Sequence, residues 1–209
     1  MKRMYGMLVF GILIVGSLVY VMLFDSDRSP SSYEKTTISQ LEMKVHPEST
    51  VEELKDMLAK YDRDVAPQIN NEFERKLAER MYVEKKMYEE AVDVEQLLIR
   101  AKKQASFDRA WLAHAKGEYG IVVTDEAIDE WIEKGPDSEV IESQSRYAEA
   151  KEMSVYELNH DYYRDQYVKW VVWEALIPLV TKRYEASSEQ VLDNNRLIEL
   201  YEQEVENSL

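Results

Sequence analysis

The run from Met4 to Phe24 contains no charged residue, and it constrains the chain more than any other stretch. As a helix, a run of this length would be roughly 31 Å long, which matches the hydrocarbon core of a bilayer. Lys2 and Arg3 precede the run, and Asp25 follows it. Because positively charged residues are retained on the cytoplasmic side, the N-terminus should lie inside and everything after the run outside. We therefore predict a single transmembrane helix that anchors the chain through residues 1–24.

A cleaved signal peptide is the alternative interpretation of this run. Signal peptides usually have a shorter apolar stretch, followed by small residues at an A-x-A-like cleavage site. The present run is longer, and the sequence VYVMLFDSD at its end offers no such site. The chain also contains no cysteine, which excludes a lipid on a processed N-terminal cysteine, disulfide bonds and thiol catalysis. We expect a retained anchor in the cell membrane and an extracytoplasmic C-terminal domain, as in an exported protein of a Gram-positive bacterium.

Composition divides the rest of the chain into a linker and one helical domain. Residues 25–49 begin with small polar residues, as flexible linkers do, and the later alternation of Leu41, Met43 and Val45 indicates one short strand or extended segment. The chain has only 6 glycines and 5 prolines and is rich in helix-forming residues. The remaining stretch of about 160 residues is long enough for one hydrophobic core. We predict an all-α fold for residues 50–209.

Cap and breaker residues set the helix boundaries that we predict. Ser49 and Thr50 precede Glu52 and Glu53, an arrangement typical of a capping box. The first expected helix is 51–61. A long helical part follows, which begins at Pro67 and ends at Gly117 and is either continuous with a bend or divided in two by Asp93 as a cap. The later expected helices are 125–134 after Thr124, 138–152, a segment that is opened by the capping box of Ser154 and Glu157 and leads into 167–180, and 188–206.

The tryptophans and the most apolar helical segment mark the expected core. Residues 167–180 contain Lys169 and Glu174 and are too short to span a bilayer, so we expect a central core helix. Pro178 should kink this helix or end it near Ile177. The side chains expected to face inward include Trp111, Trp131, Val140, Ile141, Trp170, Trp173 and Leu176.

The sequence contains no pattern typical of a catalytic or metal site. His46, His114 and His160 each lack a second histidine three or four residues away, and G-x-S-x-G, Walker and G-x-G-x-x-G motifs are absent. The net charge of −15 argues against nucleic-acid binding, which needs basic clusters. We expect a non-enzymatic protein without a cofactor or metal, in which His160 lies on the surface or on a helix face.

Met81, Tyr82, Met87 and Tyr88 are the candidates for a peptide-binding face. Adjacent apolar pairs on one helix point in two directions, and methionine adapts well to varied apolar ligands. In the alternative interpretation, both faces pack against neighbouring helices and bind no ligand.

The segment Ala115–Lys134, AKGEYGIVVTDEAIDEWIEK, resembles a phrase in the N-terminal chaperone domain of SurA- and PrsA-type exported foldases. In that family a long helix is followed by A-x-x-x-G-I-x-V-T-D-E-E-I-D-x-x-I and then by further helices. The matching residues are Gly120, Ile121, Val123, Thr124, Asp125, Glu126, Ile128, Asp129 and Ile132. The resemblance extends over about residues 67–180.

The resemblance implies a SurA N-terminal-like multi-helix domain that binds unfolded exported proteins through apolar surface. This chain ends at Leu209 without the parvulin-type isomerase module of the family and lacks its lipid-anchoring cysteine, so no catalytic residue is carried over. We expect a membrane-anchored, extracytoplasmic, chaperone-like protein without catalysis. The alternative is a scaffold or interaction subunit with one dedicated envelope partner. Promiscuous holding of unfolded proteins should need an exposed, irregular apolar groove, whereas a dedicated partner should need one compact patch.

Overall fold

The computed structural model describes residues 49–185 and 192–209, and these form an all-helical domain with no strand among them. The predicted all-α class is therefore confirmed for this part of the chain. The expected anchor and the expected extended segment near residues 41–46 lie outside the described residues. Of the helices within the described ranges, none is both long enough and apolar enough to cross a bilayer.

The described part contains eight α-helices, two turns of 3-10 helix and one π-helical turn. In chain order the elements are α2 (Val51–Asp64), a 3-10 turn (Ala66–Gln68), α3 (Glu72–Met87), α4 (Val94–Tyr119), α5 (Asp125–Lys134), a 3-10 turn (Pro136–Ser138), α6 (Glu142–Ala150), α7 (Val155–Glu157), the π turn (Leu158–Tyr162), α8 (Arg164–Glu185) and α9 (Asn194–Asn207).

Four of the predicted helix starts are confirmed by their caps. Thr50 and Ser154 each form a complete capping box, with Glu53 and Glu157 respectively. The side chains of Asp93 and Thr124 accept hydrogen bonds from the backbone N–H three residues later. Asp93 therefore begins a separate helix, and the alternative of one continuous bent helix through this region is wrong.

Two predicted boundaries around α3 and α4 are wrong for identifiable reasons. Pro67 lies in a single 3-10 turn, and α3 begins only at Glu72, where the Asn71 side chain accepts a hydrogen bond from the backbone N–H of Glu74. Helix α4 passes through Gly117 and ends at Tyr119. The stop is Gly120, which adopts φ 68°, a left-handed conformation that glycine reaches without strain.

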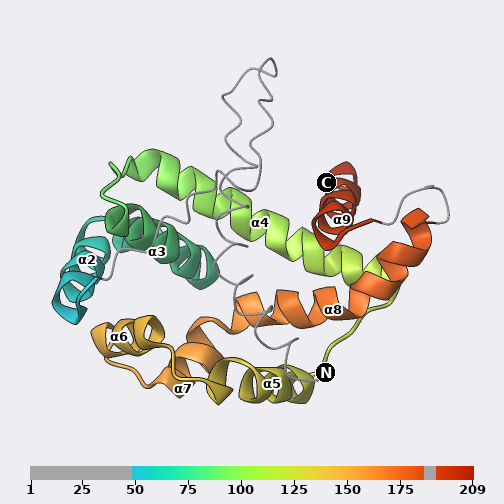
Figure 1. The fold of residues 1–209 in the computed structure, drawn as a ribbon. Helices are drawn as coiled ribbons and strands as arrows, with labels where there is room; N and C mark the ends of the chain where they lie inside the picture. Colours follow the sequence, from blue (N-terminus) through green and yellow to red (C-terminus); the bar gives the residue numbers. More distant parts are fainter. Residues whose placement is uncertain (1–48, 186–191) are drawn as a thin grey trace. The chain divides into compact units, whose positions relative to one another are not determined.

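Later boundaries also differ from the predictions. Helix α6 is shorter than expected. Val140 precedes it and is 94 % exposed, so the predicted inward position of Val140 is wrong. Helix α8 continues beyond Pro178 to Glu185, and Figure 1 shows its last turns leaving the line of its first turns. Helix α9 begins at Asn194 and is capped by Asp193, and residue 188, where we predicted that a helix begins, lies outside the described residues.

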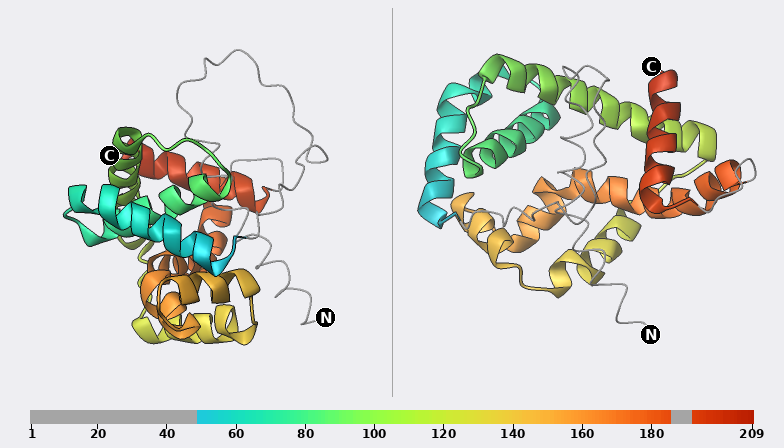
Figure 2. Two further views of the ribbon diagram at one scale, coloured as in Figure 1. Left: turned by 90° about the vertical axis from the view of Figure 1, so that its left-hand side faces the viewer. Right: turned by 45° about the horizontal axis from the view of Figure 1, so that its top comes forward.

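Helix α8 makes contacts with helices from several parts of the chain, and the other helices pack around it and against one another. Helix α3 packs along α4, and α2 packs against both α3 and α6. Helix α8 contacts α4, α5 and α9, and α9 in turn contacts α4 (Figure 2). A buried apolar cluster joins α2, α3, the first half of α4, α6 and the π turn, and includes Leu54, Tyr61, Leu77, Tyr82, Ala101, Tyr147, Leu158 and Tyr162.

An aromatic cluster joins α4, α8 and α9. The rings of Trp111 and Tyr201 lie 4.8 Å apart, and the Tyr201 hydroxyl donates to the carbonyl oxygen of Trp111 at 2.8 Å. Trp173 lies 6.0 Å from Tyr201 and donates to Asn194 at 3.0 Å. Trp111, Trp173 and Leu176 are buried, which confirms three of the predicted core residues.

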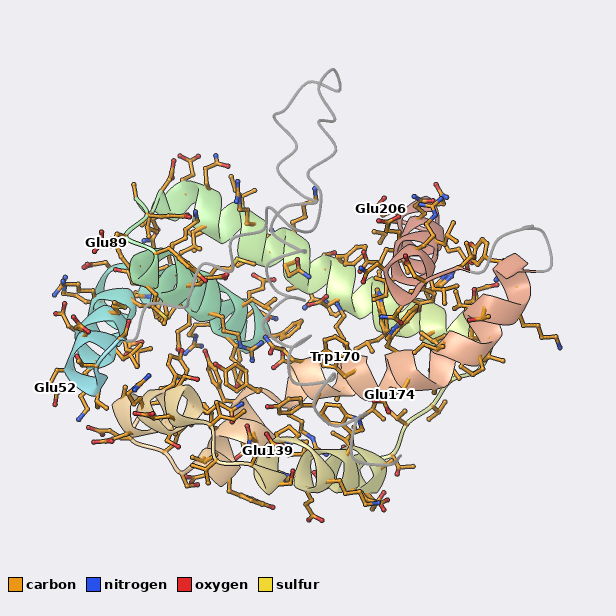
Figure 3. All side chains as sticks on the ribbon, in the orientation of Figure 1. Glu52, Glu89, Glu139, Trp170, Glu174 and Glu206 are labelled. Carbon is orange, nitrogen blue, oxygen red and sulfur yellow. The ribbon has the colours of Figure 1, made fainter. Side chains whose placement is uncertain are left out.

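Three other residues that were predicted to face inward are only half-buried. Trp170 and Ile141 have intermediate exposure. Trp131 on α5 is likewise half-buried, and its indole N–H donates at 3.1 Å to Glu174, which Figure 3 labels on α8. A polar indole nitrogen keeps one edge of the ring at the solvent boundary.

Replacing Trp173 should therefore destabilise the domain far more than replacing Trp170. Trp173 is 4 % exposed, and a tryptophan-to-alanine change in a core costs about 3–5 kcal/mol. Urea unfolding of the full chain in mild detergent, followed by circular dichroism, measures both variants. We expect less than half that loss for Trp170→Ala. Equal losses, or an unchanged midpoint for Trp173→Ala, would show that α8 is not central to the core.

Candidate functional site

A pocket of about 240 Å³ opens where α3, α4 and α8 meet. We call it the Phe73 pocket. It is lined by Phe73, Asp108, Arg109, Leu112, Asp165, Val168 and Lys169. Phe73, Leu112 and Val168 each come from a different helix and supply its apolar walls. The other four lining residues are charged, so the pocket combines an apolar interior with a charged rim.

A largely buried ion pair joins α3 to α8 at the Phe73 pocket. The Arg80 guanidinium donates to both carboxylate oxygens of Asp165, at 2.7 and 2.6 Å, and also to the carbonyl oxygen of Tyr162. Its carbon lies 4.8 Å from the centre of the Tyr162 ring. Burial opposes the charge, but hydrogen bonding and attraction to Asp165 outweigh it and raise the pKa of Arg80.

A second ion pair joins α4 to α8 at the same pocket. Lys169 donates to Asp108 at 2.7 Å, and Gln104 donates to the same carboxylate oxygen at 2.9 Å. The Lys169 ammonium also lies 5.2 Å from the centre of the Trp111 ring. Asp108 is buried, so the pair replaces the water that its carboxylate would otherwise need. Charged contacts therefore hold both α3 and α4 against α8 at the pocket.

Glu79 links α3 to α6 and to the π turn. Its carboxylate accepts hydrogen bonds from the hydroxyls of Tyr147 at 3.1 Å and Tyr162 at 2.8 Å, and from Lys151. Burial, together with the nearby charge of Glu79, raises the pKa of both tyrosine hydroxyls well above the usual value for tyrosine. These hydroxyls therefore stay protonated and serve as donors.

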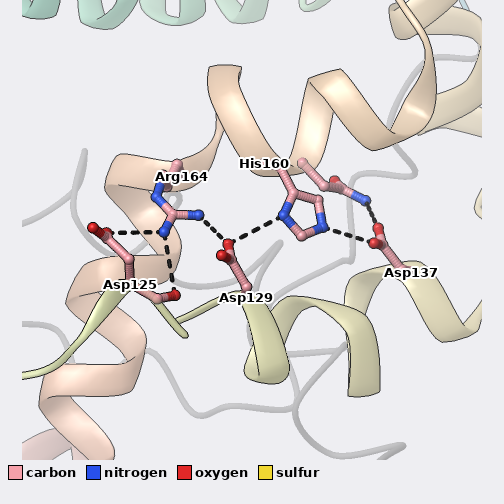
Figure 4. A network of polar contacts seen from close by, with 6 residues as sticks. Asp125, Asp129, Asp137, His160 and Arg164 are labelled. Carbon is pink, nitrogen blue, oxygen red and sulfur yellow. Dashed lines mark hydrogen bonds and ion pairs between the residues drawn. The ribbon is translucent and has the colours of Figure 1, made fainter. Parts of the chain in front are cut away.

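The histidine network in Figure 4 joins α5, the 3-10 turn after it and the π turn. We predicted that His160 lies on the surface or on a helix face; it is 6 % exposed and lies in the π turn, so the surface alternative is wrong. Its Nδ1 lies 3.3 Å from a carboxylate oxygen of Asp129, and its Nε2 lies 2.9 Å from one of Asp137. The Tyr156 ring stacks on the imidazole with centroids 4.0 Å apart.

Two further donors complete this network. Arg164 donates to Asp129 and, at 3.0 Å, to Asp125, and Asn159 donates to Asp137 at 2.7 Å. The hydrogen bond from Arg164, with a smaller contribution from His160, lowers the pKa of Asp129. A general base needs a ring nitrogen that faces its substrate, whereas both nitrogens of His160 face carboxylates. The geometry therefore suits a contact that holds α5 against the π turn.

A third polar cluster attaches α9 to α4 and α8. Glu204 accepts hydrogen bonds from the Tyr119 hydroxyl at 2.8 Å and from Tyr184, and it lies 3.1 Å from Nε2 of His114. Arg183 is 3.2 Å away. Burial raises the pKa of this carboxyl, but the hydrogen bonds from Tyr184, His114 and Tyr119 outweigh it and lower the pKa. His114 thus has a structural partner.

The four predicted peptide-binding residues do not form one exposed face. Tyr82 is 6 % exposed, and its ring lies 5.6 Å from that of Tyr61 in the core. Met81 and Met87 are half-buried and pack against the same core, and Tyr88 is half-buried at the end of α3. This burial favours the alternative interpretation, in which both faces pack on neighbouring helices. A peptide-binding role for the four stays a prediction.

Sequence reasoning did not identify the Phe73 pocket. Phe73 belongs to an apolar stripe on α3, and Val168 belongs to the apolar segment predicted as core, but neither pattern shows that the two meet. The available signal is weaker: charged residues lie next to apolar ones at Asp108, Arg109 and Lys169. Among the described residues, no group of three or more His, Cys, Asp or Glu side chains is arranged to hold a metal.

Comparisons of the chain with protein-family models, with curated proteins and with solved structures find no match.

Glu202 on α9 should make the stability of the domain fall as pH rises. Burial raises the pKa of this half-buried carboxyl to about 7, helped by Glu206 and Asp108 and opposed by Lys169. Because the folded state binds the proton more tightly than the unfolded state, stability is lost between about pH 4.5 and 7 and stays lower above that range. Glu202→Gln should remove this loss and stabilise the protein at pH 8 by about 1–3 kcal/mol.

The control is Glu149→Gln, a change at an exposed carboxylate on α6. Thermal unfolding of the full chain at pH 5 and pH 8 compares both variants with the parent. A Glu202→Gln protein that is no more stable than the parent at pH 8, or that keeps the parent's pH dependence, would contradict the assignment.

Proposed function

We propose that the chain is a non-catalytic binding protein whose helical domain takes an apolar side chain of a partner protein into the Phe73 pocket. The observation that carries this proposal is the pocket itself, with apolar walls contributed by three helices. The ion pairs Arg80–Asp165 and Lys169–Asp108 hold these helices in place. Such preorganisation reduces the cost of ordering a site when a ligand binds.

The size of the pocket favours one anchoring side chain. A cavity of about 150 Å³ lined by leucine, isoleucine and phenylalanine can hold benzene. The Phe73 pocket has about 240 Å³, which suits one ring-sized side chain and is too small for a broad peptide stretch. Interfaces commonly depend on a few such anchors in desolvated pockets. We therefore favour a dedicated partner with a short motif.

A chaperone for exported proteins is the second proposal, supported by the resemblance to SurA- and PrsA-type domains. Such a protein needs extended apolar surface. The most exposed large apolar residues among those described lie on separate elements: Ile99, Val122, Val140, Tyr156, Leu179 and Leu209. This scatter supports a compact binding site better than a continuous groove. The uncharged run Met4–Phe24 supports a membrane anchor in either case.

Filling the pocket tests the proposed function. Val168→Trp places an indole against Phe73 and Leu112, whereas Val122→Trp adds the same side chain at an exposed position outside the pocket. The probe is the amide-capped peptide Gly-Ser-Phe-Ser-Gly, titrated calorimetrically into the full chain in mild detergent. We expect weak binding to the parent and to Val122→Trp, and at least about ten-fold weaker binding to Val168→Trp.

Absence of binding to the parent, or equal binding by both tryptophan variants, would refute the pocket as the site. Light scattering of a denatured model protein separates the two proposals. A dedicated binding protein should leave its aggregation unchanged. Suppression at substoichiometric amounts, lost in Val168→Trp, would support the chaperone proposal instead.

A further inference from the structure

We infer that the Phe73 pocket selects an aromatic side chain that is flanked by acidic residues. This inference rests on the proposed function and adds the chemical class of the ligand. It depends on how the four charged residues of the rim are paired. A partner can form an ion pair with a rim residue without breaking an existing one only where that residue has no close partner within the domain.

Three of the four rim charges are tightly paired. Asp165 receives two hydrogen bonds from Arg80, at 2.6 and 2.7 Å. Asp108 and Lys169 pair with each other at 2.7 Å. A ligand that used any of these groups would have to replace a short, largely buried contact. The acidic residues of the rim are thus already neutralised and offer little to a basic ligand.

Arg109 differs from the other three. Its side chain is 54 % exposed, and a Glu74 carboxylate oxygen lies 3.9 Å from its Nη2, which is beyond hydrogen-bonding distance. A guanidinium has five N–H donors in a planar fork that fits a carboxylate in a two-point contact. An aspartate or glutamate beside the anchoring residue of a ligand can therefore bind Arg109 while the anchor enters the pocket.

An aromatic anchoring residue would make a second contact with the Arg109 guanidinium, through the face of its ring. A guanidinium also stacks favourably on the face of an aromatic ring. In this domain, Arg80 already makes such contacts with Tyr162 and Tyr163, at 4.8 and 5.1 Å from their ring centres. Arg109 lines the pocket and can contact the ring of a bound residue in a similar way. An aliphatic anchor would fill the volume without this contact.

The negative net charge of the chain disfavours the approach of an acidic ligand from a distance, but it has little effect on the short-range contact with Arg109. The net charge of −15 repels acidic ligands over long range. At physiological ionic strength, charges more than about 8 Å apart are largely screened. At about 150 mM salt, the residues of the rim therefore determine whether acidic or basic ligands bind more tightly, so binding should be measured at that concentration.

Three amide-capped peptides test the inference: Gly-Asp-Phe-Asp-Gly, Gly-Ser-Phe-Ser-Gly and Gly-Lys-Phe-Lys-Gly, titrated calorimetrically into the full chain at about 150 mM salt. An exposed ion pair contributes up to about 1 kcal/mol, so the acidic peptide should bind about three- to five-fold more tightly than the serine peptide. The lysine peptide should bind most weakly. Arg109→Gln should remove the preference for acid, and because it also removes the contact between the guanidinium and the bound ring, it should weaken binding of the serine peptide by about two- to five-fold.

The matched control is Lys55→Gln, which removes one positive charge at an exposed position on α2 and should keep the preference. If no peptide binds the parent, the proposed function itself fails. If the three peptides bind equally, or the lysine peptide binds best, the pocket stands and the acidic preference is overturned. A preference that survives in Arg109→Gln assigns the selectivity to another group and also overturns the inference.

Discussion

The ion pair between Arg80 and Asp165 is the contact on which the arrangement of the helices around the Phe73 pocket depends. It joins α3, which contributes to the buried apolar cluster with α2, α4 and α6, to α8, which contacts α4, α5 and α9. Removing one partner of a fully buried pair costs about 3–5 kcal/mol, and the cost here should be smaller because the Asp165 side chain is 24 % exposed. The pair adds less net stability than that, since both charges were desolvated on folding. Its value lies in specifying one position of α3 against α8.

The same design recurs elsewhere in the domain. Glu79, Glu204 and His160 each sit at a junction of several elements and receive donors or acceptors from more than one of them. Burying such groups is favourable only when every partner is in place, so the clusters select one packing over near alternatives. The Phe73 pocket is different, because three of the four charged residues on its rim are tightly paired within the domain, whereas Arg109 is largely exposed.

The local features of the fold could be predicted from the sequence, whereas its long-range contacts could not. Thr50, Asp93, Thr124 and Ser154 act on residues three positions away, so a reader of the sequence can see both partners. His160 and Asp129 are 31 residues apart, and Arg80 and Asp165 are 85 apart. Their pairing depends on the relative positions of helices, which periodicity does not specify. The pocket was missed for the same reason.

Methyl-labelled NMR tests most directly whether a ligand enters the pocket or contacts the 81–88 segment. The full chain, labelled at Met, Leu and Val methyl groups in mild detergent, is titrated with the serine-flanked phenylalanine peptide. The account predicts that the methyl signals of Leu112 and Val168 shift with a common saturation curve, while those of Met81 and Met87 stay in place. Saturable shifts at Met81 and Met87, with Leu112 and Val168 unmoved, would contradict it.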